Sequence, residues 1–265
     1  MPTQKFTQQD VDQLSTWFQR RYESQFAWSH SVSMCMDLSA LRGAWSMAGR
    51  DSGGDATDYS GLAHHMTLGG NVTYNQSGLA TWAVFPGAAG DYFTHLDHAD
   101  FDITGGEAFE DAPGMSAGGW CYFDNAVGAN EYIMSKWAGA GVRSFVVSRN
   151  AATGVIDFLV STDGTNIANT ASSTSTPATA AWFHWSVRFV PSAEMSVFIN
   201  GVETLDVAGI PATIFNSAAA LNLGAYSAAA GMMSGRQSLV WICGAALTDS
   251  QHTSIFHQTQ AVFGI

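Results

Sequence analysis

The residues best able to bind a ligand lie in an acidic segment between Arg50 and Lys136. No lysine or arginine occurs between these two positions, whereas twelve of the 22 acidic residues do. The other ten acids balance the ten basic residues, so this segment accounts for the whole net charge of −12. Carboxylate oxygens without a neighbouring ammonium group suit Ca²⁺, and Asp55, Asp58 and Asp91 are the candidate ligands. The alternative is that these carboxylates keep the loops of a β-protein soluble and bind no cofactor.

Four histidines share the acidic segment, at positions 64, 65, 95 and 98. Together with the carboxylates of residues 96–102 they could surround a transition metal. Their spacing does not match His-Glu-x-x-His, in which two histidines one helical turn apart bind zinc. The sequence therefore does not predict a transition-metal site, and Ca²⁺ is the one candidate cofactor.

Tryptophan side chains offer flat apolar faces on which sugar rings can stack. Trp137 and Trp182 are the candidate sugar-binding residues. The chain has nine tryptophans, and for most of them packing inside a core is the alternative. No catalytic residues are predicted, because there is no Gly-x-Ser-x-Gly nucleophile elbow. Residues 49–54 also lack the Gly-Lys-Ser/Thr ending of a phosphate-binding loop.

The composition excludes several classes of partner. Hydrophobic residues make up 46% of the chain and charged residues 12%, which predicts a sizeable core under an uncharged polar surface. A chain with two lysines and a net charge of −12 is not expected to bind nucleic acid. No apolar run has the ~18 residues of a membrane span, and we expect no signal peptide. Cys35, Cys121 and Cys243 lie far apart, which predicts neither a disulfide framework nor a zinc site and favours a reducing cytoplasm.

Residues 6–27 have the pattern of an amphipathic helix. Thr7 with Asp10 resembles a capping box, and an apolar stripe follows at three- and four-residue steps. The stripe consists of Val11, Leu14, Phe18, Tyr22 and Phe26. We expect residues 1–40 to form a helical extension that joins copies of the chain into a homo-oligomer or attaches it to a larger assembly. The alternative is that the stripe packs on the chain's own domain.

Residues 41–265 have the pattern of strands and turns in a single all-β domain. Asn200-Gly201 is a strong hairpin signal, because both turn positions need a positive φ. Two hairpins are expected, from residues 195–199 with 202–207 and from residues 144–149 with 154–161. Residues 168–181 are almost wholly Ala, Ser, Thr and Asn, and we expect them to form a flexible loop.

Within residues 182–189 apolar and polar side chains alternate, as in a strand. The residues expected to share one face are Phe183, Trp185, Val187 and Phe189. On the other face we expect Trp182, His184, Ser186 and Arg188.

Six short motifs follow one another along this domain. They occupy residues 41–47 with 58–61, 85–87 with 90–93, 182–187, 197–201, 221–224 and 240–248. In this order they resemble the concanavalin A-like, or laminin-G-like, jelly-roll domains over about residues 41–258. The resemblance implies a jelly-roll β-sandwich for residues 41–265 and is much less specific for function.

Two departures from that family bear on its activities. Some members supply a Ca²⁺ ligand just before the final strand, where this chain has Ser238. The family's glucanases carry Glu-x-Asp-x-x-Glu on one strand, and the paired carboxylates cleave the glycosidic bond. The nearest match, residues 107–111, is flanked by glycines and a proline, which indicates a loop. Glycan hydrolysis is therefore not expected.

These features favour a non-enzymatic role. We expect a virion structural or decoration protein that displays a lectin-like sandwich on a tailed-phage particle, assembled in the host cytoplasm and able to bind surface glycans weakly. Its partners would be other virion proteins or further copies of itself. The alternatives are a stand-alone carbohydrate-binding module and a glycoside hydrolase or lyase.

Overall fold

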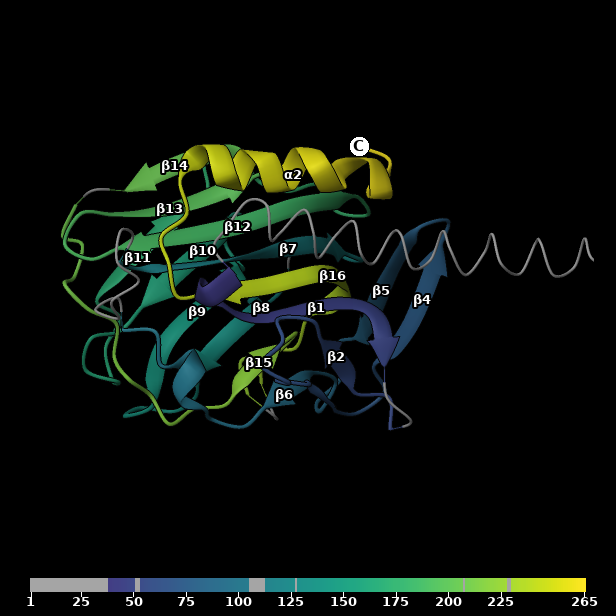
Figure 1. The fold of residues 1–265 in the computed structure, drawn as a ribbon, viewed down its shortest axis with the longest axis horizontal. Coiled ribbons are helices and arrows are strands. Elements are labelled where there is room, and N and C mark those ends of the chain that lie inside the picture. The colour runs from purple at the N-terminus through teal and green to yellow at the C-terminus, as the bar shows by residue number, and fades with distance from the viewer. Residues whose placement is uncertain (1–37, 51–52, 105–112, 127, 207, 228–229) are drawn as a thin grey trace, which may run out of the picture.

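The computed structural model describes residues 38–50, 53–104, 113–126, 128–206, 208–227 and 230–265. These residues form a sandwich of two antiparallel β-sheets, with one α-helix lying along the outside of the larger sheet (Figure 1). The all-β sandwich predicted from the sequence is confirmed. The predicted helical extension at residues 1–40 falls almost wholly outside the described residues.

The described strands divide into a nine-stranded and a seven-stranded sheet. The larger sheet contains β1 (Leu41–Arg50), β2 (Ala56–Asp58), β4 (Thr73–Ser77), β5 (Ala80–Pro86), β7 (Met115–Phe123), β12 (Trp182–Val190), β13 (Glu194–Ile199), β14 (Val202–Asp206) and β16 (Ser234–Cys243). The smaller sheet contains β3 (Thr67–Leu68), β6 (Phe93–His95), β8 (Glu131–Trp137), β9 (Arg143–Arg149), β10 (Ile156–Val160), β11 (Asn169–Ser172) and β15 (Leu221–Leu223). The helices are the short 3₁₀ turns η1 (Leu38–Ala40) and η2 (Ala99–Phe101) and the α-helix α2 (Asp249–Phe263).

The strand order brings distant parts of the chain together. In the larger sheet it is β14-β13-β12-β7-β16-β1-β2, with β5 on β16 and β4 on β5. In the smaller sheet it is β11-β10-β9-β8-β15-β6-β3. The central strands β7, β12 and β16 are therefore neighbours although they come from three separate regions of the sequence.

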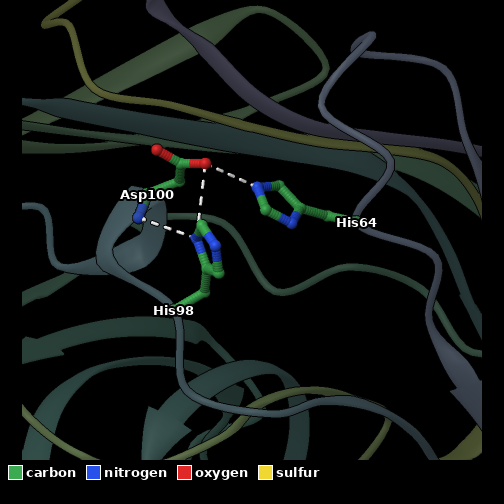
Figure 2. Close-up of side chains that lie close together, drawn as sticks. All are labelled: His64, His98 and Asp100. Atoms are coloured by element: carbon green, nitrogen blue, oxygen red, sulfur yellow. Dashed lines mark hydrogen bonds and ion pairs between the residues drawn. The ribbon is translucent and has the colours of Figure 1, made fainter.

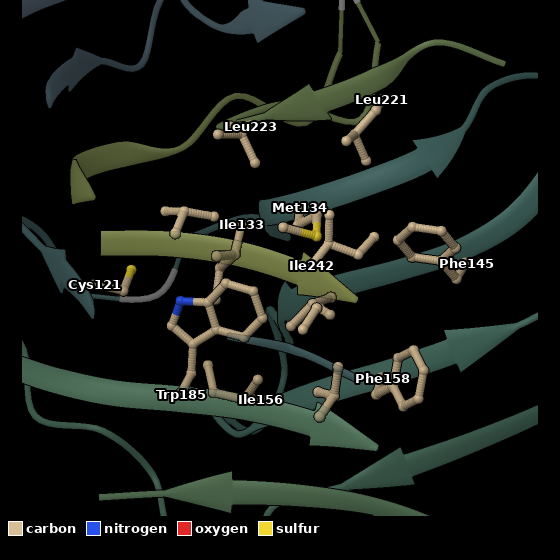
Figure 3. Close-up of a cluster of buried hydrophobic side chains, with 14 of the residues drawn as sticks. Cys121, Ile133, Met134, Phe145, Ile156, Phe158, Trp185, Leu221, Leu223 and Ile242 are labelled. Atoms are coloured by element: carbon tan, nitrogen blue, oxygen red, sulfur yellow. The ribbon is translucent and has the colours of Figure 1, made fainter. Parts of the chain in front are cut away.

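Apolar side chains from both sheets meet in one core (Figure 3). The predicted alternation in β12 is confirmed, since Phe183, Trp185, Val187 and Phe189 all belong to this core. Because successive side chains of a strand point to opposite faces, the intervening residues of β12 lie on the outside of the sandwich. That outer face carries the candidate functional site.

Both predicted hairpins are confirmed. Strand β13 pairs with β14 across Asn200 and Gly201, whose φ angles are 50° and 76°, as a two-residue turn of this type requires. Strand β9 pairs with β10. The expected loop at residues 168–181 differs in part, because Asn169–Ser172 form β11 on the edge of β10. Main-chain hydrogen bonds to β10 allow even small polar residues to continue the sheet.

Helix α2 was not expected from the sequence. Thr248 and Gln251 form a reciprocal capping box at its start, and Gly264 ends it in the left-handed conformation. The buried positions are His252, Ile255, Phe256 and Thr259. Two of these four are polar, so the apolar stripe that normally indicates a helix is weak. Within the described residues, no helix has the length and apolar character needed to cross a membrane.

Candidate functional site

The outer face of the nine-stranded sheet is partly covered by α2 (Figure 1). Phe263 stacks on Trp120 with ring centroids 4.3 Å apart, and Trp120 Nε1 donates to Thr259 Oγ1 at 2.9 Å. Nearer the start of the helix, His252 stacks on Phe198 at 4.1 Å. These contacts bury the part of the sheet under α2 and leave no room there for a ligand.

Two buried histidines line the contact between α2 and the sheet. Burial lowers the pKa of His184 to about 3 and lowers the pKa of His252 well below its usual value. Neither ring nitrogen of His184 has a hydrogen-bond partner among the described residues. His184 lies beside Trp120, with ring centroids 5.5 Å apart. Both histidines are therefore neutral packing residues at pH 7, and His184 is not placed to act as a catalytic base.

At the end of α2, where Phe263 packs on Trp182 with ring centroids 4.7 Å apart, the same face carries a group of rings around one arginine. We call it the aromatic–arginine surface, and it consists of Trp82 (β5), Tyr122 (β7), Asp124, Trp182 (β12) and Arg236 (β16). The Trp182 ring lies 5.7 Å from that of Trp82 and 5.6 Å from that of Tyr122. The Arg236 guanidinium lies 4.2 Å over the Tyr122 ring, and Nη2 lies 3.5 Å from Asp124 Oδ1.

Strand register explains why these side chains meet. Arg236 lies opposite Val84 on one side and Tyr122 on the other, and Tyr122 lies opposite Trp182. Residues opposite one another in antiparallel strands point to the same face. The group therefore forms only when β5, β7, β12 and β16 pair in the register that turns these side chains to the same face.

The aromatic–arginine surface combines the features that recognise carbohydrate. Tyr122, Trp182 and Arg236 are partly exposed, while Trp82 is buried beside Trp182. Aromatic faces can stack on the apolar face of a sugar ring, and a guanidinium beside a carboxylate offers both donors and acceptors to sugar hydroxyls. Trp182 was predicted as a sugar-binding residue, whereas the other members of the surface were not.

The other predicted sugar-binding residue lies elsewhere. Trp137 is at the end of β8 in the smaller sheet and is 4% exposed. The Arg143 guanidinium lies over its ring at 5.4 Å. Since the ring is already covered, Trp137 has no free face for a sugar, and the structure does not bring it together with Trp182.

The three carboxylates predicted to bind Ca²⁺ accept main-chain hydrogen bonds from different sets of residues. Asp58 accepts from the N–H groups of Ala44, Ser60 and His64, each at 2.9 Å. Asp91 is fully buried and accepts from Asn71 N at 2.7 Å and Ala88 N at 2.9 Å, and Asp55 accepts from Leu68 N at 2.8 Å. Their oxygens hold turns together, and among the described residues they do not converge as a group of potential ion ligands.

The structure instead brings together two of the histidines and a different aspartate. His64, His98 and Asp100 each place one potential ligand atom within 4.8 Å of the others (Figure 2). From the sequence these residues were not expected to bind a metal, because their spacing resembles no helical zinc motif. The two histidines come from different loops, so no spacing in the sequence could identify the pair.

The predicted assembly residues Val11, Leu14, Phe18, Tyr22 and Phe26 lie outside the described residues. Their role stays a prediction.

Comparison with known proteins identifies the family of the fold. The model of the concanavalin A-like lectin/glucanases superfamily matches residues 90–251, more than half of the chain. No curated protein sequence matches this chain. The solved structures that resemble it include the binding domain of Paraclostridial Mosquitocidal Protein 1, with a TM-score of 0.64 and 11% identity over 83% of this chain.

Two further similar structures come from botulinum neurotoxins. One is the binding domain of serotype G, with a TM-score of 0.63, 14% identity and 82% of this chain covered. The other is the serotype D ligand-binding domain in complex with N-acetylneuraminic acid, with a TM-score of 0.60, 12% identity and 83% of this chain covered. The chain spans 52%, 50% and 51% of the lengths of these three structures, about half in each case. At these identities the likeness concerns the fold, and all three structures are of binding domains.

Proposed function

The chain belongs to the concanavalin A-like lectin/glucanases superfamily, and from this premise we propose that it is a non-enzymatic, lectin-like module that binds glycans through the aromatic–arginine surface. The observation that carries the proposal is the placement of Arg236 at 4.2 Å over the Tyr122 ring and beside Asp124, next to the partly exposed Trp182. The solved toxin domains support it as binding domains of the same fold.

The charge of the surface favours neutral sugars. Asp124 lies beside Arg236, and the whole chain has a net charge of −12, so an anionic glycan would meet a repulsive field. A neutral sugar could donate a hydroxyl hydrogen bond to Asp124 and accept one from Arg236 while its apolar face stacks on Trp182. The serotype D toxin domain binds N-acetylneuraminic acid, so sialylated glycans belong in the test.

The non-enzymatic assignment rests on the carboxylates of this surface. Glycoside hydrolases of the usual kind need two carboxyl groups on either side of the scissile bond. Among the described residues, the aromatic–arginine surface contributes only Asp124. Release of reducing sugar from laminarin, agar or alginate by the purified protein would contradict this assignment.

The first experiment compares glycan binding by the full chain and its surface variants on a glycan array. We expect Arg236→Gln and Trp182→Leu each to weaken binding by about tenfold or more. Arg236→Gln removes a hydrogen bond from a charged group, which contributes about 1.5–3 kcal/mol. Trp182→Leu removes the aromatic face on which a sugar ring would stack. Trp182→Phe should retain part of the affinity, since it keeps an aromatic face.

The matched control is Arg42→Gln, which removes the same charge from β1. Leu41 pairs with Cys243, at the opposite end of β16 from Arg236, so the control should bind glycans like the wild type. Equal binding by Arg236→Gln and the wild type, at an unchanged melting temperature, would rule out this surface as the site.

We also propose that residues 1–40 attach the module to a tailed-phage particle, or to other copies of itself, in the host cytoplasm. Support comes from the apolar stripe in the sequence and from its position ahead of a β-sandwich. The stripe gives a testable expectation. Replacing Leu14 and Phe18 by glutamate in the full chain should reduce the sedimentation coefficient to that of a monomer or abolish particle incorporation, while the melting temperature stays unchanged. An unaltered oligomeric state and normal incorporation would remove the reason to regard the stripe as an anchor.

A further inference from the structure

A compact group of two histidines and a carboxylate lies on the loops next to β2 and β6, apart from the aromatic–arginine surface (Figure 2). His64 comes from the loop after β2, and His98 and Asp100 come from the turn that begins η2. His64 Nε2 lies 2.7 Å from Asp100 Oδ2, and His98 Nδ1 lies 3.3 Å from the same oxygen. Side chains from two loops thus converge on one point.

The contact between His98 and Asp100 brings two electron-pair donors together. Nδ1 of His98 accepts a hydrogen bond from the main-chain N–H of Asp100 at 3.2 Å, which places a lone pair on this nitrogen. The same nitrogen faces Asp100 Oδ2, which is also an electron-pair donor. A metal ion bound at this point would use the electron pairs of both atoms, and Nδ1 would give up its hydrogen bond to the main-chain N–H. With Nε2 of His64, the group offers three potential ligand atoms to one ion.

The surroundings hold His64 in place. The main-chain N–H of His64 donates to the buried Asp58 at 2.9 Å, and its carbonyl accepts from Trp45 Nε1 at 2.9 Å. Phe101, which is fully buried, packs against the His64 ring with centroids 4.8 Å apart. Donors fixed in this way lose little freedom on binding a metal, as in sites whose ligands are oriented by outer partners.

The nearby positive charge is neutralised. The buried ammonium of Lys136 pairs with Asp97 and with Asp102, whose Oδ1 lies 3.1 Å from Nζ. Both aspartates flank the His98–Asp100 turn. Lys136 therefore does not oppose a cation at the group, and the acidic segment around it attracts one.

From this geometry we propose that His64, His98 and Asp100 bind a Zn²⁺ ion, with solvent as the remaining ligand. Two imidazoles and one carboxylate are a common three-ligand set for zinc. Ligands of a tetrahedral zinc ion lie about 3.3 Å from one another. The His98–Asp100 distance of 3.3 Å matches this separation, and the His64–Asp100 distance of 2.7 Å would widen as the ion replaces the hydrogen bond. Ca²⁺ prefers six or more oxygen ligands and should not bind at this group. His98 and Asp100 have side-chain exposures of 47% and 35%, so the ion can enter from solvent.

The test is a Zn²⁺ titration of the full chain after treatment with a chelator. We expect about one Zn²⁺ per chain to bind by isothermal titration calorimetry and to raise the melting temperature, since an ion that binds only the folded state stabilises it. His98→Ala and Asp100→Asn should each weaken binding by at least about tenfold, the usual loss when even an outer partner of a ligand is removed. With Co²⁺ in place of Zn²⁺, the wild type should show the visible absorption of a tetrahedral site.

His257→Ala is the matched control, because it removes an exposed histidine on α2. It should bind Zn²⁺ like the wild type, and His98→Ala should keep its glycan binding. Equal Zn²⁺ affinity in the wild type and His98→Ala would overturn the proposal, as would the absence of any Zn²⁺ binding. An equal rise in melting temperature with Ca²⁺ would also overturn it.

Discussion

Replacing Arg188 by methionine should lower the free energy of unfolding by about 3 kcal/mol. Arg188 is 6% exposed and lies on the outer face of β12 under the start of α2. Its guanidinium pairs with Glu194 and Glu203 at 2.6 Å and with Asp249 at 2.5 Å, and it donates to the Leu247 carbonyl at 3.1 Å. Methionine fills a similar volume but leaves the carboxylates facing one another without a counter-charge. Urea denaturation followed by tryptophan fluorescence measures the change.

The control for this prediction is Arg236→Met, which removes an arginine whose side chain is 32% exposed and lies 3.5 Å from a single aspartate. It should change the free energy of unfolding by less than about 1 kcal/mol, as substitutions at surface charges usually do. Asp249→Asn should have an intermediate effect, because Asp249 is 63% exposed and is one of three acidic partners. If Arg188→Met were as stable as the wild type, the ion pairs would not be what holds α2 to the sheet.

Lowering the pH from 7.5 to 5 should reduce the free energy of unfolding by about 2 kcal/mol through His184, and further through His252. Burial lowers the pKa of both side chains, that of His184 to about 3, from an unfolded value of 6.5. Below pH 6.5 the unfolded chain therefore binds protons that the folded chain excludes. Stability is fully present above pH 6.5 and falls with decreasing pH by about 1.4 kcal/mol per unit for each histidine. Denaturation curves at pH 7.5, 6.5, 5.5 and 5 measure this slope.

His184→Leu tests which histidine is responsible. It should remove about 2 kcal/mol of the loss between pH 7.5 and 5. It should not destabilise the protein at pH 7.5, because the two ring nitrogens of His184 have no partner among the described residues. His257→Leu, on the exposed side of α2, should retain the full loss. A pH dependence that is identical in the wild type and in His184→Leu would show that His184 does not stay neutral in the folded state.

The regular parts of the fold were predictable because their signals are local. Asn200-Gly201 specifies its hairpin through the positive φ of both residues, and the alternation of β12 identifies the core face without knowledge of its neighbours. Helix α2 was missed because His252 and Thr259 occupy two of its buried positions. Their burial is explained by partners on the sheet. Ser186 Oγ lies 2.9 Å from His252 Nδ1, and Trp120 Nε1 donates to Thr259 Oγ1 at 2.9 Å.

The candidate sites were less predictable. Trp182 was identified by residue type alone, and Trp137 was identified by the same reasoning although Arg143 covers its ring. The carboxylates at positions 55, 58 and 91 matched a calcium site in composition, but each accepts main-chain hydrogen bonds from its own set of residues. A side chain's chemistry follows from its type, whereas its availability depends on what packs around it.

By itself the amino-acid sequence determined that this protein is an acidic β-sandwich of the lectin-like family, with a strongly charged segment and an alternating, ring-rich core. The acidity and the strand pattern follow from composition and from contacts between residues close along the chain, and the family was indicated by the resemblance of six ordered motifs. Only the tertiary structure decided which side chains meet. Strand pairing places Arg236 opposite Tyr122 and Tyr122 opposite Trp182. His64 contacts Asp100, which is 36 positions away in the sequence. Pairing between distant strands is set by the packing of the whole sandwich, and no local pattern records it.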